Sequence, residues 1–436
     1  DLRHGGHRGA RVVGDAFLVD GDGRREFQPG WVRIEDGQIA ELGRGNPPET
    51  PVAGDADSLI CPGFIDAHIH LPQIDAVGCD PPCGGGLLEW LHRIVFPAEM
   101  RWQDADVAQE QAGIAYRRML RAGTLGYAGF LTSHFHSVTS VIRAGHRLPL
   151  RAIAGQVLMD RGAPEPLLHH RLARLAKSKR GRIAMSVNPR FAVGCSDELL
   201  SIAKARASDE AFVQTHLAES RRECELVAEL FPDDPHYTGV YDRHGLLTDR
   251  ALLAHCVHLA DDEWRLIAER RSVVVHCPTA NTFLQSGLFN LDAARKHGVR
   301  LALGSDVAAG PDLAMPRVAR AMIEVAKMQA MTRQAGAKPH VPNPAEAWDL
   351  ITRGNADALG WSDSGRLEVG AAADLLVLRV GFDLDDYLIG RLIYTWRDEY
   401  ITHRVVDGRL IDFDPSASEP APPRAWPGPG QSDSVA

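Results

Sequence analysis

Short apolar runs alternate with helical patterns through the middle of the chain, and this repeat constrains the fold most strongly. Eight runs rich in Val, Ile and Leu, each typical of a buried strand, cover residues 59–65, 124–131, 150–159, 183–187, 211–215, 251–254, 272–275 and 299–304. A helical pattern follows each run, as in residues 104–123, which end on glycine. Eight such units over roughly 250 residues or more predict a (β/α)₈ barrel. No glycine-rich phosphate motif follows the first run, which disfavours a dinucleotide-binding sheet.

Both ends of the chain carry the pattern of antiparallel strands. Asp36-Gly37 and Asp407-Gly408 each separate two alternating runs, and Asp-Gly suits a type I′ hairpin turn because both turn residues need positive φ. We therefore expect a small discontinuous β-sandwich domain, built from both termini, to accompany the barrel. The expected division is 11–58 plus 365–414 for the sandwich, 59–364 for the barrel, and a disordered Pro-rich tail at 415–436.

Composition excludes several classes of protein. The chain has 436 residues, 44% of them hydrophobic and 24% charged, which is ordinary globular usage. Its net charge of −9 has the wrong sign for a general nucleic-acid binder. No apolar stretch of about 18 residues predicts a membrane span, and the first ten residues lack the apolar core of a secretory signal. We expect a cytoplasmic protein whose seven scattered cysteines are reduced.

Polar side chains follow the predicted strands at the end where barrels of this type hold their active sites. His68 and His70 alternate with Ile69, so both imidazoles point to the same side and could hold one cation. His216 after the fifth strand and Asp306 after the eighth would complete a mixed nitrogen and oxygen ligand set that leaves a position for water. The sequence therefore predicts one zinc ion, with ferrous iron as the alternative, at these four residues.

A metal ion at such a site lowers the pKa of a bound water from about 15.7 towards about 7. Glu219 lies three residues beyond His216, where it could carry a proton from the water to the substrate. The alternative for Glu219 is a first-turn acid that complements a helix dipole. His255 could orient the water and Asp306 could relay a proton to the leaving group. For His276 we favour packing beneath the site.

Three further sequence patterns bear on metal binding. His134 and His136 repeat the His-x-His spacing, and we favour a loop pair with at most a substrate contact. Cys79 and Cys83 have no further thiolates nearby to complete a zinc site. Dinuclear proteins of this architecture bridge two metals with a carboxylated lysine on the fourth strand, and residues 183–191 contain no lysine. One metal ion and deamination are therefore expected, rather than two and amide-ring hydrolysis.

Taken together, these motifs resemble the amidohydrolase superfamily over almost the whole chain. The segments that carry the resemblance are PGFIDAHIH (62–70), QTHLAES (214–220), LLAHC (252–256), HCPTAN (276–281), GSDVAAG (304–310) and GRLEVGAAADLLVL (365–378). Within the superfamily, HIHLPQ (68–73), LLEWLHRIVFPAEMRW (87–102), NPRFAVGCSDELL (188–200) and the region 214–248 are similar to the guanine deaminase family.

The resemblance implies zinc at the four predicted ligands, with Glu219 as proton shuttle and His255 near the attacking water. It assigns the base pocket to Gln73, Arg190 and Phe191, and an amide, a guanidinium and a stacking ring agree with recognition of a purine carbonyl. The implied reaction is hydrolysis of guanine at C2 to xanthine and ammonia, as a step of purine catabolism. The implied partner is a purine or pterin base, and the implied assembly is a homodimer.

Other substrates remain open because two segments depart from the family pattern. GCDPPCGGG (78–86) and TSHFHSVTS (132–140) both fall where the far edge of a substrate would reach. The alternatives are a pterin such as isoxanthopterin, 8-oxoguanine, cytosine or a triazine; Gln73 and Arg190 favour a base that bears a carbonyl. A non-catalytic scaffold of the same fold is less favoured because such proteins usually lose metal ligands, and here all four are present together with Glu219.

Overall fold

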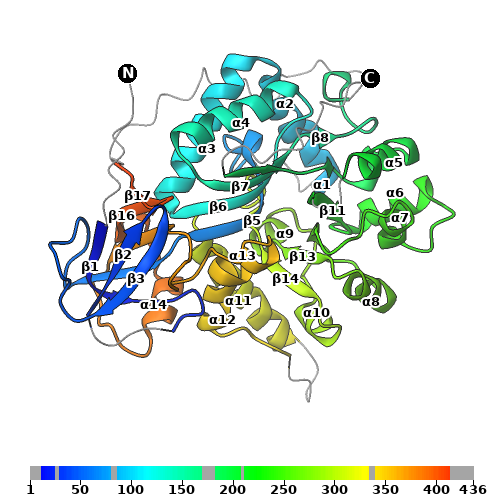
Figure 1. The fold of residues 1–436 in the computed structure, drawn as a ribbon. Coiled ribbons are helices and arrows are strands. Elements are labelled where there is room, and N and C mark those ends of the chain that lie inside the picture. Colours follow the sequence, from blue (N-terminus) through cyan, green and yellow to red (C-terminus); the bar gives the residue numbers. More distant parts are fainter. Residues whose placement is uncertain are drawn as a thin grey trace.

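The computed structural model describes residues 11–24, 29–79, 86–168, 182–207, 211–332 and 339–412. Two four-stranded parallel sheets form the middle of the molecule, with α-helices in most of the described connections between successive strands (Figure 1). The first sheet consists of β5 (Phe64–His70), β6 (Thr124–Phe130), β7 (Arg151–Gly155) and β9 (Ile183–Met185). The second consists of β11 (Val213–Leu217), β12 (Ala251–His255), β13 (Val273–His276) and β14 (Arg300–Leu303).

The two parallel sheets meet at both of their edges. A parallel bridge joins Val187, just after β9, to Val213 in β11. At the other edge, the backbone N–H of Asp306 donates to the carbonyl of His68 at 2.8 Å, and that of His70 donates to Val307 at 3.0 Å. These contacts bring the end of β5 against the segment that follows β14, so side chains far apart in the sequence share one edge.

The first predicted strand is wrong in its bounds. Residues 59–65 divide at Gly63 into β4 (Ser58–Pro62), which pairs with β1 and β15, and β5, which pairs with β6. A Cβ at residue 63 would lie 2.4 Å from Cδ1 of Leu125, so only glycine allows this close passage. His68 and His70 consequently lie inside β5 and not after it, although they still alternate with Ile69.

The remaining predicted strands differ from the structure by a few residues at their ends. The run 150–159 is interrupted at Gln156, which separates β7 from the short β8 (Val157–Leu158). The strand β8 pairs with β10 (Asn188–Pro189) in a separate two-stranded sheet. The break at Gln156 lies at the carboxyl end of β7, where the chain leaves the parallel sheet.

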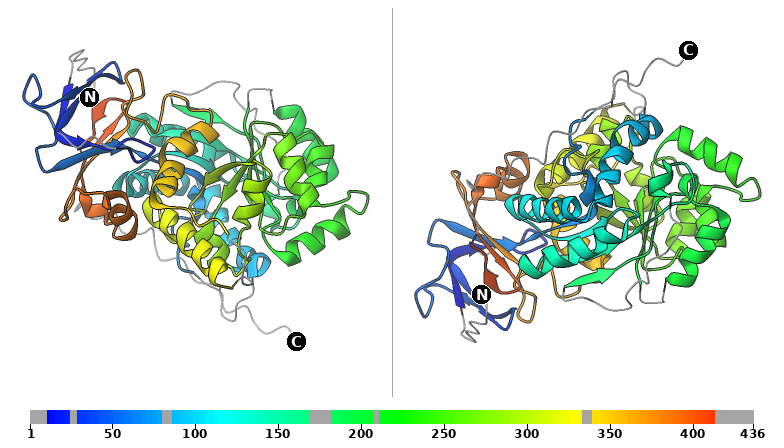
Figure 2. Two further views of the ribbon diagram at one scale, coloured as in Figure 1. Left: turned by 90° about the horizontal axis from the view of Figure 1, so that it is seen from below. Right: turned by 90° about the horizontal axis from the view of Figure 1, so that it is seen from above.

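Strands from both ends of the chain form one seven-stranded sheet in the order β17-β16-β15-β4-β1-β2-β3. Its further strands are β1 (Arg11–Leu18), β2 (Gly30–Glu35), β3 (Gln38–Arg44), β15 (Leu375–Arg379), β16 (Ile401–Val406) and β17 (Arg409–Leu410). Figure 2 shows these blue and orange strands side by side at one end of the molecule. The predicted tail at 415–436 lies outside the described residues.

Both predicted hairpins are confirmed. Asp36 and Gly37 have φ values of 49° and 83° between β2 and β3, and Asp407 and Gly408 have 53° and 71° between β16 and β17. The two turns touch, because a Cβ on Gly408 would lie 2.6 Å from Cα of Gly37. The Asp-Gly turns thus position the N-terminal and C-terminal strands against each other.

Helix α3 (Ala105–Ala122) shows how local sequence sets the helix ends. The Asp104 side chain accepts from the backbone N–H groups of Asp106 and Val107, and Gly123 ends the helix at φ 83°. The other α-helices are α1 (Gly86–Trp90), α2 (Phe96–Met100), α4 (Phe135–Arg147), α5 (Asp197–Arg206), α6 (Arg221–Leu230), α7 (Tyr237–Arg243), α8 (Asp261–Glu269), α9 (Pro278–Phe283), α10 (Leu291–Lys296), α11 (Met315–Thr332), α12 (Pro344–Asp349), α13 (Asn355–Ala358) and α14 (Leu388–Tyr394). None of the described helices is long and apolar enough to cross a membrane.

Candidate active site

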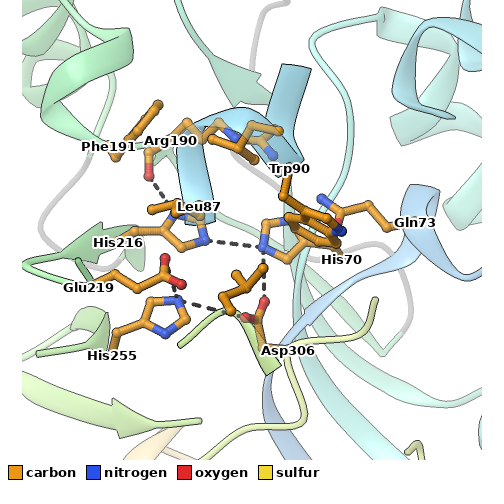
Figure 3. A pocket seen from close by; sticks show the side chains of 12 residues that line it. His70, Gln73, Leu87, Trp90, Arg190, Phe191, His216, Glu219, His255 and Asp306 are labelled. Atoms are coloured by element: carbon orange, nitrogen blue, oxygen red, sulfur yellow. Dashed lines mark hydrogen bonds and ion pairs between the residues drawn. The ribbon is translucent and has the colours of Figure 1, made fainter. Parts of the chain in front are cut away.

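Four predicted metal ligands converge at the carboxyl ends of the parallel strands. His68 and His70 come from β5, His216 from β11, and Asp306 from the segment after β14, and all four are buried. One possible ligand atom of each lies within 4.8 Å of those of the others. Nε2 of His70 is 3.1 Å from Nε2 of His216 and 3.4 Å from Oδ1 of Asp306 (Figure 3). Nε2 of His68 is 3.2 Å from the same carboxylate oxygen.

The chemistry of this cluster fits one divalent metal ion. Burial is the main cause that lowers the pKa of His68, His70 and His216 well below the ordinary value. Their rings are therefore neutral, and each can bind a metal ion through a nitrogen lone pair. Nε2 of His68 is buried, and apart from the Asp306 carboxylate 3.2 Å away it has no polar partner among the described residues. Three neutral imidazoles and one carboxylate are a donor set that a zinc-like cation satisfies.

Hydrogen bonds behind the cluster hold its members in place. Nδ1 of His216 donates to the carbonyl of Arg190 at 2.6 Å, which leaves the lone pair on Nε2. Asp66 accepts from the backbone N–H groups of His68 at 3.1 Å and Ser305 at 2.9 Å. These bonds tie β5 to the segment that carries Asp306.

Glu219 lies between β11 and α6 with its carboxyl beside the cluster. Its Oε2 is 3.4 Å from Nε2 of His255, and its Oε1 accepts from the hydroxyl of Ser286 at 3.2 Å. Burial, followed by the charges of Asp306 and Glu223, raises the pKa of Glu219 well above its ordinary value. A carboxyl that binds a proton more readily in this way suits general acid and base chemistry.

The helix-dipole alternative for Glu219 is not supported by the geometry. The N-terminus of α6 is capped by Ser220 and Glu223, whose side chains form a capping box with the backbone. Glu219 precedes this cap, and its carboxyl points to the pocket (Figure 3). The residue therefore contributes to the pocket and not to the helix end.

His255 ends β12 and faces two carboxyl groups. Its φ of 72° is unusual for a residue other than glycine. Nδ1 donates to Oδ1 of Asn281 at 2.9 Å, while Nε2 lies 3.8 Å from Oδ2 of Asp306. Asn281 thereby fixes the ring so that Nε2 faces the pocket.

The three residues predicted to recognise a base line the same pocket as the metal cluster (Figure 3). Gln73 ends the short helical turn Leu71–Gln73 that follows β5, and Arg190 and Phe191 follow β10. The pocket is lined by His70, Gln73, Leu87, Trp90, Leu91, Arg190, Phe191, His216, Glu219, His255, Leu284 and Asp306. Polar side chains thus share the pocket with the apolar side chains of Leu87 and Trp90 in α1, of Leu91 directly after it, and of Leu284 after α9.

Glu99 on α2 is a site residue that sequence reasoning did not identify. It is completely buried and accepts hydrogen bonds from Nη1 of Arg190, at 2.8 Å to each carboxylate oxygen, and from Nε2 of Gln73 at 2.9 Å. The available signal was a lone carboxylate in the apolar run IVFPAEM (94–100). The apolar wall residues Leu87 and Trp90 were also not identified.

Residues of the weaker patterns lie elsewhere. His276 stacks on Phe289 with ring centroids 4.4 Å apart, and burial lowers its pKa to about 3, which agrees with packing beneath the site. His134 directly precedes α4, in the N-cap position, and His136 lies in its first turn, so the predicted loop pair is in fact a helix start. The described lining of the pocket includes neither residue. Cys79 carries a free thiol, and Cys83 lies outside the described residues.

Comparison with known proteins places the chain in a family. The sequence model of the amidohydrolase family matches residues 59–411. The chain belongs to the amidohydrolase family. This amidohydrolase is 34% identical to guanine deaminase of Escherichia coli K12 over 424 residues, which cover 92% of each chain. It is 30% identical to human guanine deaminase over 382 residues, 80% of this chain and 82% of that protein.

Solved structures agree with this assignment. Guanine deaminase of E. coli superposes with a TM-score of 0.83 at 30% identity, covering 93% of this amidohydrolase and 99% of that chain. Guanine deaminase of C. acetobutylicum, solved with bound guanine in the active site, superposes with a TM-score of 0.84 at 26% identity, covering 92% and 100%. The mixed α/β architecture with parallel strands is therefore that of amidohydrolases.

Proposed function

We propose that this amidohydrolase converts guanine and water to xanthine and ammonia. One observation carries the proposal: His70, His216 and Asp306 of the four-residue metal cluster line the same pocket as Gln73, Arg190 and Phe191. The similarity to guanine deaminases over most of the chain supports guanine as the base. In the reaction a C–O bond forms at C2 of guanine, the C2–N bond to the amino group breaks, and protons pass to the ring and to the leaving amine.

His68, His70, His216 and Asp306 would hold one metal ion, which we propose is zinc, with ferrous iron as the alternative. When bound, such an ion lowers the pKa of a water molecule and supplies Lewis-acid activation. The absence of a lysine between residues 183 and 191 supports one ion and not two.

Proton transfer is assigned to residues of the chain itself. Glu219, whose raised pKa suits a carboxyl that gains and loses a proton, takes a proton from water and delivers it to a ring nitrogen. His255, held by Asn281, keeps its Nε2 towards the pocket and orients the attacking water. Asp306 relays a proton to the departing amine.

Three residues would recognise the base. The guanidinium of Arg190 and the amide of Gln73 supply hydrogen bonds to the carbonyl edge of the purine, and Phe191 supplies a ring for stacking. The apolar side chains of Leu87 and Trp90 would exclude water from the opposite face. This combination supports a flat, neutral, carbonyl-bearing ring as the substrate.

The finer points of architecture and setting belong to the same proposal. We propose that the two parallel sheets close into a (β/α)₈ barrel, which the contacts at both of their edges support. The proposed domains are a discontinuous β-sandwich of residues 11–58 and 365–414 and a catalytic domain of residues 59–364. Strand β4 spans the boundary between them and pairs with strands of the first domain. A cytoplasmic homodimer active in purine catabolism stays a prediction.

An ammonia-release screen with the metal-loaded protein tests the function. The panel is guanine, 8-oxoguanine, cytosine, adenine, isoxanthopterin and ammeline, and guanine is expected to give the highest kcat/KM. Faster release from a pterin or triazine would assign the same chemistry to another ring. No release from any ring, with the metal in place, would favour the non-catalytic scaffold.

A further inference from the structure

Glu99 lies behind the base pocket and contacts both proposed recognition side chains. Its carboxylate is completely buried, and the ion pair with Arg190 neutralises a charge that would otherwise be costly to bury. The same carboxylate accepts a hydrogen bond from Gln73. Glu99 is not among the residues that line the pocket, so any effect on a substrate must pass through these two partners.

Two neighbours fix which way the amide of Gln73 points. The Glu99 carboxylate can only accept hydrogen bonds, so the amide nitrogen faces Glu99 at 2.9 Å. The backbone N–H of Ala308 can only donate, and it lies 3.5 Å from the amide oxygen. Ala308 follows the metal-ligand candidate Asp306 by two residues. The acceptor of the amide therefore lies on the side of the metal cluster, and its donor lies on the side of Arg190.

We propose that Glu99 is a positioning residue that sets the substrate specificity of the pocket by locking this order of acceptor and donor. The inference rests on the proposed function and deepens it. With C2 at the metal cluster, the N1–H donor of guanine adjoins the reacting carbon, and its O6 acceptor lies one ring position further away. That order matches an acceptor near the metal and donors near Arg190.

The locked amide selects a chemical class of substrate. Rings with a lactam N–H beside the amino-bearing carbon fit, whereas 2,6-diaminopurine presents an acceptor at N1 and a donor at position 6, which is the reverse order. A donor that faces a donor, or an acceptor that faces an acceptor, in a buried pocket loses its hydrogen bond to water without gaining another. The pocket therefore binds a ring with the reverse order much more weakly. Discrimination between these two purines therefore reports the orientation of the Gln73 amide.

The variant Glu99→Gln tests the lock because its neutral amide can donate as well as accept, which frees Gln73 to turn. The ratio of kcat/KM for guanine to that for 2,6-diaminopurine should fall by about 10- to 100-fold. Most of the loss for guanine should appear in KM, and the metal content should stay at the wild-type level. An unchanged ratio would overturn the proposal.

Control variants separate positioning from a general structural effect. Glu263→Gln removes another buried carboxylate, bonded to Thr238 and Ala260 outside the pocket, and should leave the ratio unchanged. In a Gln73→Leu background, Glu99→Gln should change the ratio much less than it does in the wild type, because only the contact of Glu99 with Arg190 remains. An equal effect in both backgrounds would overturn the proposal. If Glu99→Gln does not fold, Glu99→Asp keeps the charge beside Arg190 while drawing back from Gln73, and the ratio should again fall.

A binding measurement keeps this inference separate from the proposed function. Calorimetry on Glu219→Gln protein, with and without Glu99→Gln, gives dissociation constants for guanine and 2,6-diaminopurine without turnover. If the protein prefers guanine and Glu99→Gln abolishes that preference, the lock is supported. This holds even if the wild type releases no ammonia, because the lack of ammonia release would reject only the proposed function. Equal binding of both purines to protein that retains Glu99 overturns the lock.

Discussion

The backbone carbonyl of Arg190 accepts a hydrogen bond of 2.6 Å from Nδ1 of His216. One residue therefore serves both halves of the pocket. Its backbone orients a metal-ligand candidate, while its side chain pairs with Glu99 behind the base pocket. Because every amino acid has the same carbonyl, a change of the side chain at position 190 can separate the two roles.

The variant Arg190→Ala should keep its metal and lose recognition of the base. We expect kcat/KM for guanine to fall about 10- to 100-fold, since a hydrogen bond to a charged group contributes about 1.5–3 kcal/mol. Elemental analysis and steady-state kinetics measure the two effects. The variant should also unfold more easily, because Glu99 is left buried without its cation. Arg190→Lys, which retains a charge, should lie between the two proteins, and an unchanged kcat/KM in Arg190→Ala would remove Arg190 from the pocket.

The variant Glu219→Gln should retain metal yet turn over very slowly. The amide cannot exchange a proton as the carboxyl does, and general acid and base catalysis contributes about 10²–10⁴-fold to a rate. Single-turnover kinetics with guanine measures the loss. Glu225→Gln, an exposed change in the helix α6 that follows Glu219, is the matched control and should behave as the wild type. Near-normal turnover of Glu219→Gln would contradict the assigned role.

Metal removal should abolish activity and weaken the fold together. The four ligand candidates are buried and come from three separate segments, so a bound ion links β5, β11 and the segment after β14. Because the unfolded chain has no preformed site, metal binding stabilises the folded state, and chelation should lower the Tm. We expect about one equivalent of zinc or iron per chain. Two equivalents by elemental analysis would contradict the mononuclear site.

The cluster could be predicted from the sequence because its geometry follows from local rules. His68 and His70 share a side through the two-residue period of a strand, and His216 and Asp306 follow apolar runs that end at the same edge. The bounds of the strands were harder to predict. Residues 59–65 look like one strand in the sequence, and only Gly63 marks the division between β4 and β5.

Glu99 could not be predicted in the same way. Its partner Arg190 is 91 residues away in the sequence, and their contact depends on how α2 packs over the strand ends. No periodicity connects the two positions. A lone carboxylate in an apolar run indicates a buried charge with a partner, but the identity of that partner is a property of the tertiary structure. The amide orientation of Gln73 depends in turn on this contact.

The buried imidazole of His276 should make the folded protein less stable in acid. His276 is buried against Phe289, and burial lowers its pKa to about 3 from an ordinary value of about 6.5. Between these two values the unfolded chain binds a proton that the folded chain does not. The contribution of His276 to stability is therefore fully present above about pH 6.5 and is lost as the pH falls towards 3, at about 1.4 kcal/mol per unit.

The variant His276→Gln has no proton to bind at this position, so its stability should depend less on pH. From pH 6.5 to 5 the free energy of unfolding of the wild type should fall by about 2 kcal/mol more than that of the variant. Urea unfolding at a fixed metal-to-protein ratio measures both. The exposed His146 provides the control, since His146→Gln should follow the wild type throughout. Parallel curves for wild type and His276→Gln would mean that the imidazole of His276 is protonated equally in the folded and unfolded chains.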